Sequence, residues 1–129
     1  MNASAASRVT LPNCDAGNVD ACQAVVLVGS TYETRGLNEQ CRLCGFDDCG
    51  ASKDAGAACV FAPLDLGIAL GSAVSLAADN RIDNRIMFTI GKAAEALGLM
   101  GDHKLIMGIP LSVSGKSPFF DRKVNDTQQ

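Results

Sequence analysis

The sequence predicts a small single domain of the α/β class, with short strands, a cysteine-rich loop and two packed helices. Two short apolar segments with β-branched residues stand near opposite ends of the chain and read as strands. Between them lie a stretch without helix or strand period and then two segments of helical pattern. At 129 residues, 47% of them hydrophobic, the chain has the length of one domain. We expect residues 1–129 to form that domain, with 1–17 and 123–129 flexible.

The two strand candidates are short apolar runs bounded by turn residues. Residues 23–29 (QAVVLVG) predict a buried strand that ends at a glycine, and residues 104–110 (KLIMGIP) predict a second strand. The polar residues 13–18 before the first strand predict a loop. Residues 111–122, rich in serine, glycine and proline, predict another loop after the second strand.

The two helix candidates fill the space between the cysteine-rich stretch and the second strand. Residues 63–78 are apolar nearly all round, which predicts a helix buried on most faces and begun by Pro63. A second helix is expected to start near Asp83 or Asn84, both good N-cap residues, and to end at Gly98. Its apolar stripe is Ile86, Ile90, Ala93, Ala94 and Leu97.

Charge and composition argue against several classes of partner. The net charge is −3 and no long run of Lys or Arg occurs, so we expect no nucleic-acid surface. The apolar stretches contain too many Gly, Ser and Asp for us to expect a membrane span. Residues 1–8 lack the basic and apolar regions of a signal peptide, and we therefore expect a cytoplasmic protein.

Six cysteines in a cytoplasmic chain indicate metal binding or redox chemistry, because cytosolic thiols are kept reduced. Four of the six lie within nineteen residues in the pattern Cys-x2-Cys-x4-Cys-x9-Cys. Two residues between ligands let both sulphurs of a Cys-x2-Cys pair reach one metal centre from a tight turn. Gly45 and Gly50 stand beside ligands, where they permit unusual φ values. The candidate ligands are Cys41, Cys44, Cys49 and Cys59.

Four thiolates suit either an iron–sulphur cluster or structural zinc. The favoured interpretation is one [4Fe–4S] cluster. Structural zinc is the alternative, since Cys-x2-Cys-x4 also opens the zinc-knuckle spacing, although that motif continues with a histidine where this chain has a cysteine. A set of unligated buried thiols is the third possibility.

Four segments resemble the uncharacterised ferredoxin-domain-containing proteins of anaerobic bacteria and archaea: residues 36–49, 60–73, 83–87 and 108–116. The resemblance extends from about Asn18 to Lys123, and it implies a [4Fe–4S] site on the four cysteines. Members of that family usually carry a helical segment before the first strand, and this chain is expected to begin after it. A core without that segment would expose apolar surface, which predicts self-association as a homo-oligomer.

Four further features are expected to be mainly structural. Cys22 is expected to be a small core residue and Cys14 a loop thiol, with a second metal site as the less favoured role. The loop from Gly108 to Ser117 is expected to be structural, although its backbone N–H groups and Lys116 could hold an anion. Asp65 is expected to interact with the helix dipole. A salt-bridge network is expected among Arg81, Asp83 and Arg85.

Three functions follow from these features. The first is an electron carrier of anaerobic metabolism that docks a redox protein partner. The second is a component of a redox enzyme, with another cofactor between the cysteine loop and residues 111–122. The third is a structural or regulatory module held by zinc or by a labile cluster. A stand-alone enzyme is less favoured, because the chain has no nucleotide-binding fingerprint and a single histidine.

Overall fold

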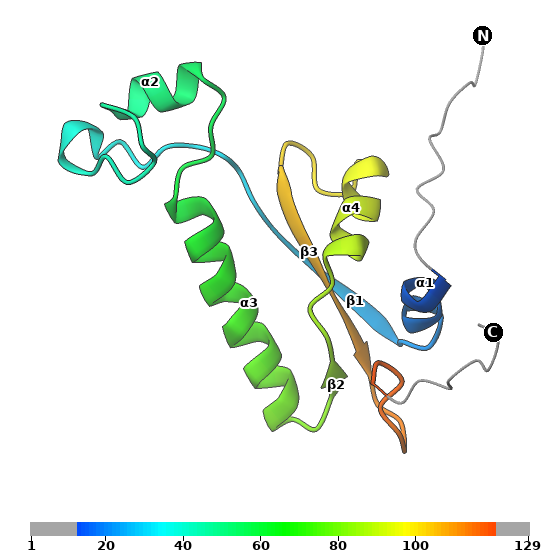
Figure 1. Ribbon diagram of the computed structural model, residues 1–129. Coiled ribbons are helices and arrows are strands. Elements are labelled where there is room, and N and C mark those ends of the chain that lie inside the picture. Colours follow the sequence, from blue (N-terminus) through cyan, green and yellow to red (C-terminus); the bar gives the residue numbers. More distant parts are fainter. Residues whose placement is uncertain (1–12, 121–129) are drawn as a thin grey trace, which may run out of the picture.

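The computed structural model describes residues 13–120, which form a three-stranded sheet with helices on both faces (Figure 1). The strands are β1 (Ala24–Ser30), β2 (Asp83–Asn84) and β3 (Leu105–Ser112), in the spatial order β1-β3-β2. Both pairings are antiparallel, and Val28 stands opposite Met107 in the β1–β3 register. The mixed α/β fold class predicted from the sequence is confirmed.

The two longer helices, α3 (Phe61–Asp79) and α4 (Phe88–Ala96), cover opposite faces of the sheet. Side chains alternate between the faces of a strand, so the odd-numbered residues of β3 all face one side. On that side the core forms where α3 packs on β3 and β1. Its buried centre is Leu66, Leu70 and Ile109, with Val28, Ala73, Val74, Leu105, Met107 and Leu111 packed around it.

On the other face, α4 approaches β3 so closely that two glycines are required. A Cβ atom on Gly91 would stand 1.8 Å from the backbone oxygen of Ile106. A Cβ atom on Gly108 would stand 2.2 Å from Cγ2 of Ile90. The absence of these side chains lets the helix backbone rest directly on the strand.

Both predicted strands are present, but the first is more exposed than predicted. β1 is an edge strand with one hydrogen-bonded neighbour, and Val25 and Val26 are 37% and 41% exposed. The prediction of a buried strand was therefore wrong for its first half. An apolar run of this length does not reveal whether both edges of the strand will be paired.

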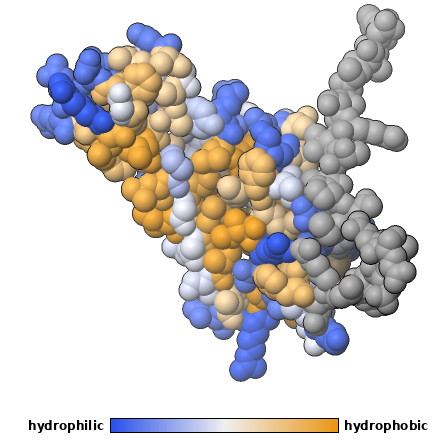
Figure 2. All heavy atoms as spheres, viewed as in Figure 1, coloured by the Kyte–Doolittle hydropathy of each residue, from blue (hydrophilic) through white to orange (hydrophobic). Residues whose placement is uncertain are grey.

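Helix α3 is present, but the prediction that it is buried on most faces was wrong. Its inner face packs on the sheet, whereas Leu64, Ile68 and Leu76 are more than half exposed on its outer face. Figure 2 shows apolar side chains gathered along this helix. By length and composition alone α3 could cross a membrane, contrary to the sequence-based expectation, although a single such helix is weak evidence of a span.

The start of the second predicted helix is shifted. Asp83 and Asn84 pair with β3 as strand β2, and the helix begins at Phe88. The side-chain amide of Asn84 donates to the carbonyl oxygens of Ile82 and Val74, which stabilises the turn after α3 in place of a helix cap. The helix ends as predicted, with Gly98 at a φ of 67°.

A helix also replaces the loop expected at residues 13–18. Helix α1 (Asn13–Asp20) ends in a turn that leads into β1, and Asn18 is buried against Met87. Contact with the α4 side of the sheet overrides the weak helix propensity of this polar segment. The flexibility expected for residues 1–12 and 123–129 concerns parts of the chain outside the described residues.

Candidate metal centre

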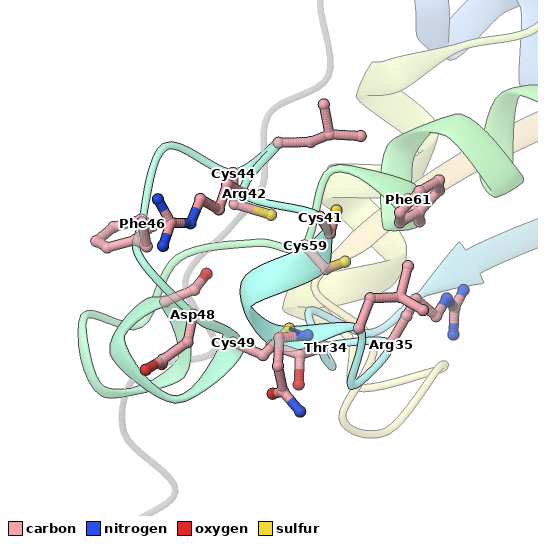
Figure 3. Close-up of a pocket in the computed structure, with 14 residues that line it drawn as sticks. Thr34, Arg35, Cys41, Arg42, Cys44, Phe46, Asp48, Cys49, Cys59 and Phe61 are labelled. Carbon is pink, nitrogen blue, oxygen red and sulfur yellow. Dashed lines mark hydrogen bonds between the residues drawn. The ribbon is translucent and has the colours of Figure 1, made fainter.

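The cysteine-rich segment forms a separate lobe beyond the first residues of α3 (Figure 1). It contains a short 3-10 helix, η1 (Asn38–Gln40), and the six-residue helix α2 (Cys49–Asp54). The side chain of Asp48 caps α2 by accepting a hydrogen bond from the Ala51 N–H at 2.8 Å. This lobe encloses a cavity. All four predicted ligands line it, namely Cys41, Cys44, Cys49 and Cys59, and Figure 3 shows their sulphur atoms around a common space.

Backbone N–H groups already point at two of these sulphurs. Asn38 donates to Sγ of Cys49, and Val60 donates to Sγ of Cys44, each at 3.2 Å. Val60 is the N-cap residue of α3, so the positive end of this nineteen-residue helix faces the cavity. Both features stabilise negative charge on the sulphur atoms, as a thiolate ligand requires.

Cys59 is the most deeply buried of the four, with 4% of its surface exposed. Burial raises the pKa of its thiol. Backbone hydrogen bonds from Phe61 and Arg35, a hydrogen bond with Cys44 and the positive charge of Arg35 outweigh that effect and hold the pKa below its usual value. The surroundings therefore make the thiolate of Cys59 easier to form than that of a free cysteine.

The loop that carries the first ligands adopts backbone conformations that are costly for most residues. Gly45 has a φ of 82°, as expected for the turn beside Cys44, but Asn38 and Arg42 also have positive φ values of 50° and 48°. Positive φ at a residue other than glycine costs about 1–3 kcal/mol and is typical of ligand-holding segments. The prediction for Gly50 was wrong, because that residue lies within α2.

One ion pair joins the lobe to the helix that supports it. Arg35, which lines the cavity, donates to the carboxylate of Asp65 in the second turn of α3. Asp65 was expected to act on the helix dipole, and the structure gives it this specific partner instead. The guanidinium is thereby held against α3, where its positive charge acts on Cys59.

The rest of the cavity wall combines apolar and polar side chains, and one polar atom in it has no hydrogen-bond partner in the part of the chain that the structure describes. The hydroxyl of Ser52 is buried and has no hydrogen-bond partner among the described residues. Apolar and aromatic side chains cover part of the space around the sulphur atoms, which strengthens electrostatic interactions on that side of the site. These side chains are Leu37, Leu43, Phe46 and Phe61.

The donor set of four thiols suits an iron–sulphur cluster and also zinc. Within residues 13–120, no three or more His, Cys, Asp or Glu side chains stand close enough to hold one metal ion. A zinc ion with Zn–S bonds of about 2.3 Å needs its four sulphurs about 4 Å apart. A cluster of irons and sulphides fills the space between its cysteines and holds them further apart.

The two other cysteines lie away from this cavity. Cys22 is half-buried, donates to the Val19 carbonyl at 3.0 Å and does not line the cavity. Cys14 belongs to helix α1 and not to the expected loop, and its side chain is outside what the structure describes.

The loop after β3 lies at the far end of the molecule from the cysteines (Figure 1). The expected pocket between the two loops is absent from the described residues, since the cavity at the cysteines includes no residue after Phe61. Ser114, Gly115 and Lys116 instead line a separate surface pocket with Arg81. Anion binding by this loop remains a prediction.

The salt-bridge network expected nearby is also absent. Within the described part of the chain, no ion pair joins Arg81, Asp83 and Arg85. Arg85 instead donates to the Phe119 carbonyl at 3.4 Å and lies over the ring of Phe120.

Sequence reasoning identified the four cysteines of the cavity and none of its other lining residues, among them Arg35, Ser52 and Phe61. Arg35 and Phe61 gave no signal in the sequence, because their place depends on how the lobe folds onto α3. Ser52 stands three positions after Cys49, a spacing that puts both on one face of a helix. That signal could have been used only if α2 had been predicted.

Comparison with known proteins agrees with this picture. Residues 55–122 match the profile of a family described as "uncharacterized protein containing a ferredoxin domain" (DUF2148). The chain belongs to this family. The matched range includes Cys59 and excludes the three earlier cysteines, so the assignment of this ferredoxin-domain protein rests mainly on α3, α4 and β3.

One curated relative is similar to this chain over a longer range than the family profile. An uncharacterised protein of Archaeoglobus fulgidus is 47% identical over 117 residues, which cover 84% of this chain. The chain spans 62% of the length of that relative. No solved structure matches. The ferredoxin-domain family, together with the four-cysteine cavity, indicates an iron–sulphur protein.

Proposed function

We propose that this protein carries one [4Fe–4S] cluster on Cys41, Cys44, Cys49 and Cys59 and transfers single electrons to a redox protein partner. The observation that supports this proposal most directly is that all four cysteines line one cavity. Membership of a ferredoxin-domain family supports it independently. The bound cluster would supply a one-electron couple.

The surrounding residues suit electron transfer more than substrate chemistry. Four cysteine ligands leave no iron position open for a substrate, which favours outer-sphere transfer. The backbone N–H groups of Asn38 and Val60 are placed to stabilise negative charge on two of the sulphurs. Apolar side chains such as Leu37 and Phe46 cover part of the cavity beside the sulphur atoms.

The location of the cavity also suits a carrier. Of the four cysteines, only Cys59 is buried, whereas the others are partly exposed at the outer end of the lobe. A partner that docks against this end would stand close to the cluster without any change in the sheet or in α3. Residues 41–49 would therefore form the side of the site through which the electron leaves.

The direct test is elemental and spectroscopic. The chain is purified without oxygen from iron-replete cells, and iron, acid-labile sulphide and zinc are measured per polypeptide. About four irons and four sulphides, with a broad visible absorption that bleaches on addition of dithionite, are the expected result. Cys44→Ala should lose the cluster, and Cys22→Ala, whose sulphur lies outside the cavity, serves as the matched control.

Two other outcomes would overturn the proposal. One zinc per chain without sulphide would make the site a structural module. An intact cluster that neither dithionite nor a stronger low-potential donor reduces would rule out electron transfer by this couple.

A further inference from the structure

The buried hydroxyl of Ser52 is the unexplained polar group of the candidate site. Ser52 is 1% exposed, and its Oγ atom has no hydrogen-bond partner among the described residues. The residue lines the same cavity as the four cysteines. Leaving a buried hydroxyl unpaired costs about 1–3 kcal/mol, so such a group usually has an acceptor that completes the structure.

The local backbone explains why this hydroxyl is available. The N–H of Ser52 donates to the Asp48 carbonyl at 3.3 Å, and its own carbonyl accepts from the Ala57 N–H at 3.0 Å. Both backbone groups are thus satisfied, and only the side chain is left without a partner. Ser52 follows Cys49 by three positions on α2, so the hydroxyl and the Cys49 sulphur lie on one face of this helix.

The cavity wall offers this donor the four cysteine sulphurs and the side-chain oxygens of Thr34, Asn38 and Asp48. None of these oxygens accepts from the Ser52 hydroxyl, and a bound cluster would bring further sulphur atoms into the same cavity. Asn38 and Val60 already direct N–H groups at Cys49 and Cys44. Ser52 would add a third donor from a different side of the lobe.

We propose that the Ser52 hydroxyl donates a hydrogen bond to a sulphur atom of the bound cluster or of its cysteine ligands, and thereby raises the reduction potential. This inference rests on the proposed cluster. A hydrogen-bond donor stabilises the more negative, reduced state, and hydrogen bonds to sulphur are among the features that set the potential of such sites. Removal of the hydroxyl should therefore make reduction harder.

The test compares variants that differ in the hydroxyl alone. Ser52→Ala removes the oxygen, while Ser52→Thr and Ser52→Val form a pair of similar size that differ by one hydroxyl. Ser75→Ala, at an exposed serine of α3, is the control for a serine far from the cavity. Iron and sulphide content is measured first, and each loaded protein is then titrated against mediators with dithionite as the reductant.

At a fixed ambient potential, Ser52→Ala and Ser52→Val should shift the ratio of oxidised to reduced protein about threefold to tenfold toward the oxidised form, in keeping with the loss of one hydrogen bond. Ser52→Thr and Ser75→Ala should keep the wild-type ratio. Pulsed electron paramagnetic resonance of the reduced protein in D2O should also lose one deuterium coupling in Ser52→Ala.

The possible failures are distinguishable. A wild-type chain without iron and sulphide would overturn the proposed function and this inference with it. A loaded Ser52→Ala protein with the potential and deuterium couplings of wild type would overturn the inference alone. If Ser52→Ala fails to bind iron, loading of the Thr variant without the Val variant supports the hydroxyl's role, and equal loading of the two contradicts it.

Discussion

The guanidinium of Arg35 is paired with the carboxylate of Asp65, and this contact connects the segment before the cysteine lobe to α3. The same arginine contributes a backbone hydrogen bond and positive charge to Cys59. A contact at the surface thus holds in place a cation whose charge acts on one candidate ligand. The contribution of the ion pair to stability and the effect of the Arg35 charge on the reduction potential can be tested separately.

Asp65→Asn should have little effect on stability. Both side chains of the pair are about half exposed, 46% for Arg35 and 50% for Asp65, so solvent screens their attraction. Exposed ion pairs of this kind contribute about 0–1 kcal/mol. Urea unfolding of the metal-free chain should show a loss of no more than about 1 kcal/mol. A loss several times larger would mean that the pair fixes the lobe on α3.

Arg35→Gln should lower the reduction potential, because a nearby cation stabilises the more negative, reduced cluster. Arg35→Lys keeps the charge and is the matched control. Redox titration of both variants, loaded to the same iron content, measures the effect. Equal potentials for the Gln variant and wild type would show that solvent screens this charge from the cluster.

Cys59→Ala should abolish cluster binding, whereas Cys22→Ala should leave iron and sulphide content unchanged. Cys59 is buried in the cavity wall, and Cys22 hydrogen-bonds within the turn before β1. Elemental analysis and visible absorption of the anaerobically purified variants provide the measurement. Full iron content in the Cys59 variant would remove this residue from the ligand set.

Removal of iron should expose the lobe to proteolysis. Its ligands are local in sequence, and metal binding and folding are coupled in such segments. After chelation, trypsin should cut faster at Arg42 and Lys53, which lie between the cysteines, than at Lys104 beside β3. Mass spectrometry of early fragments locates the cuts. Identical rates with and without chelator would indicate a lobe that is ordered without metal.

Gly91→Ala should destabilise the protein by about 3 kcal/mol or more, because its Cβ would overlap the backbone oxygen of Ile106. Gly67→Ala, on the exposed side of α3 with nothing within 4 Å, should instead stabilise it by up to about 1 kcal/mol. Urea unfolding compares both with wild type. A neutral Gly91 variant would show that α4 can move away from β3.

Local sequence patterns were enough to predict several elements of this protein. Residues 23–29 and 104–110 are apolar, β-branched runs bounded by turn residues, and both form strands. Gly98 ends α4 because a positive φ is inexpensive for glycine alone. The spacing of the four cysteines brought them to one cavity, since only eighteen positions separate Cys41 from Cys59.

Tertiary structure decided what local patterns leave open. The sheet recruits Asp83 and Asn84 as β2, so two good N-cap residues do not start a helix. Helix α3 is apolar nearly all round, and only its place on the sheet determines which side is buried. Arg35 lines the cavity only because the lobe folds onto α3, and Ser52 shares a face with Cys49 only because residues 49–54 form a helix. The sequence by itself therefore determined the strands and the set of candidate ligands, because these depend on spacing between near neighbours. The surroundings of the cysteines depend on contacts between distant segments, which exist only in the folded chain.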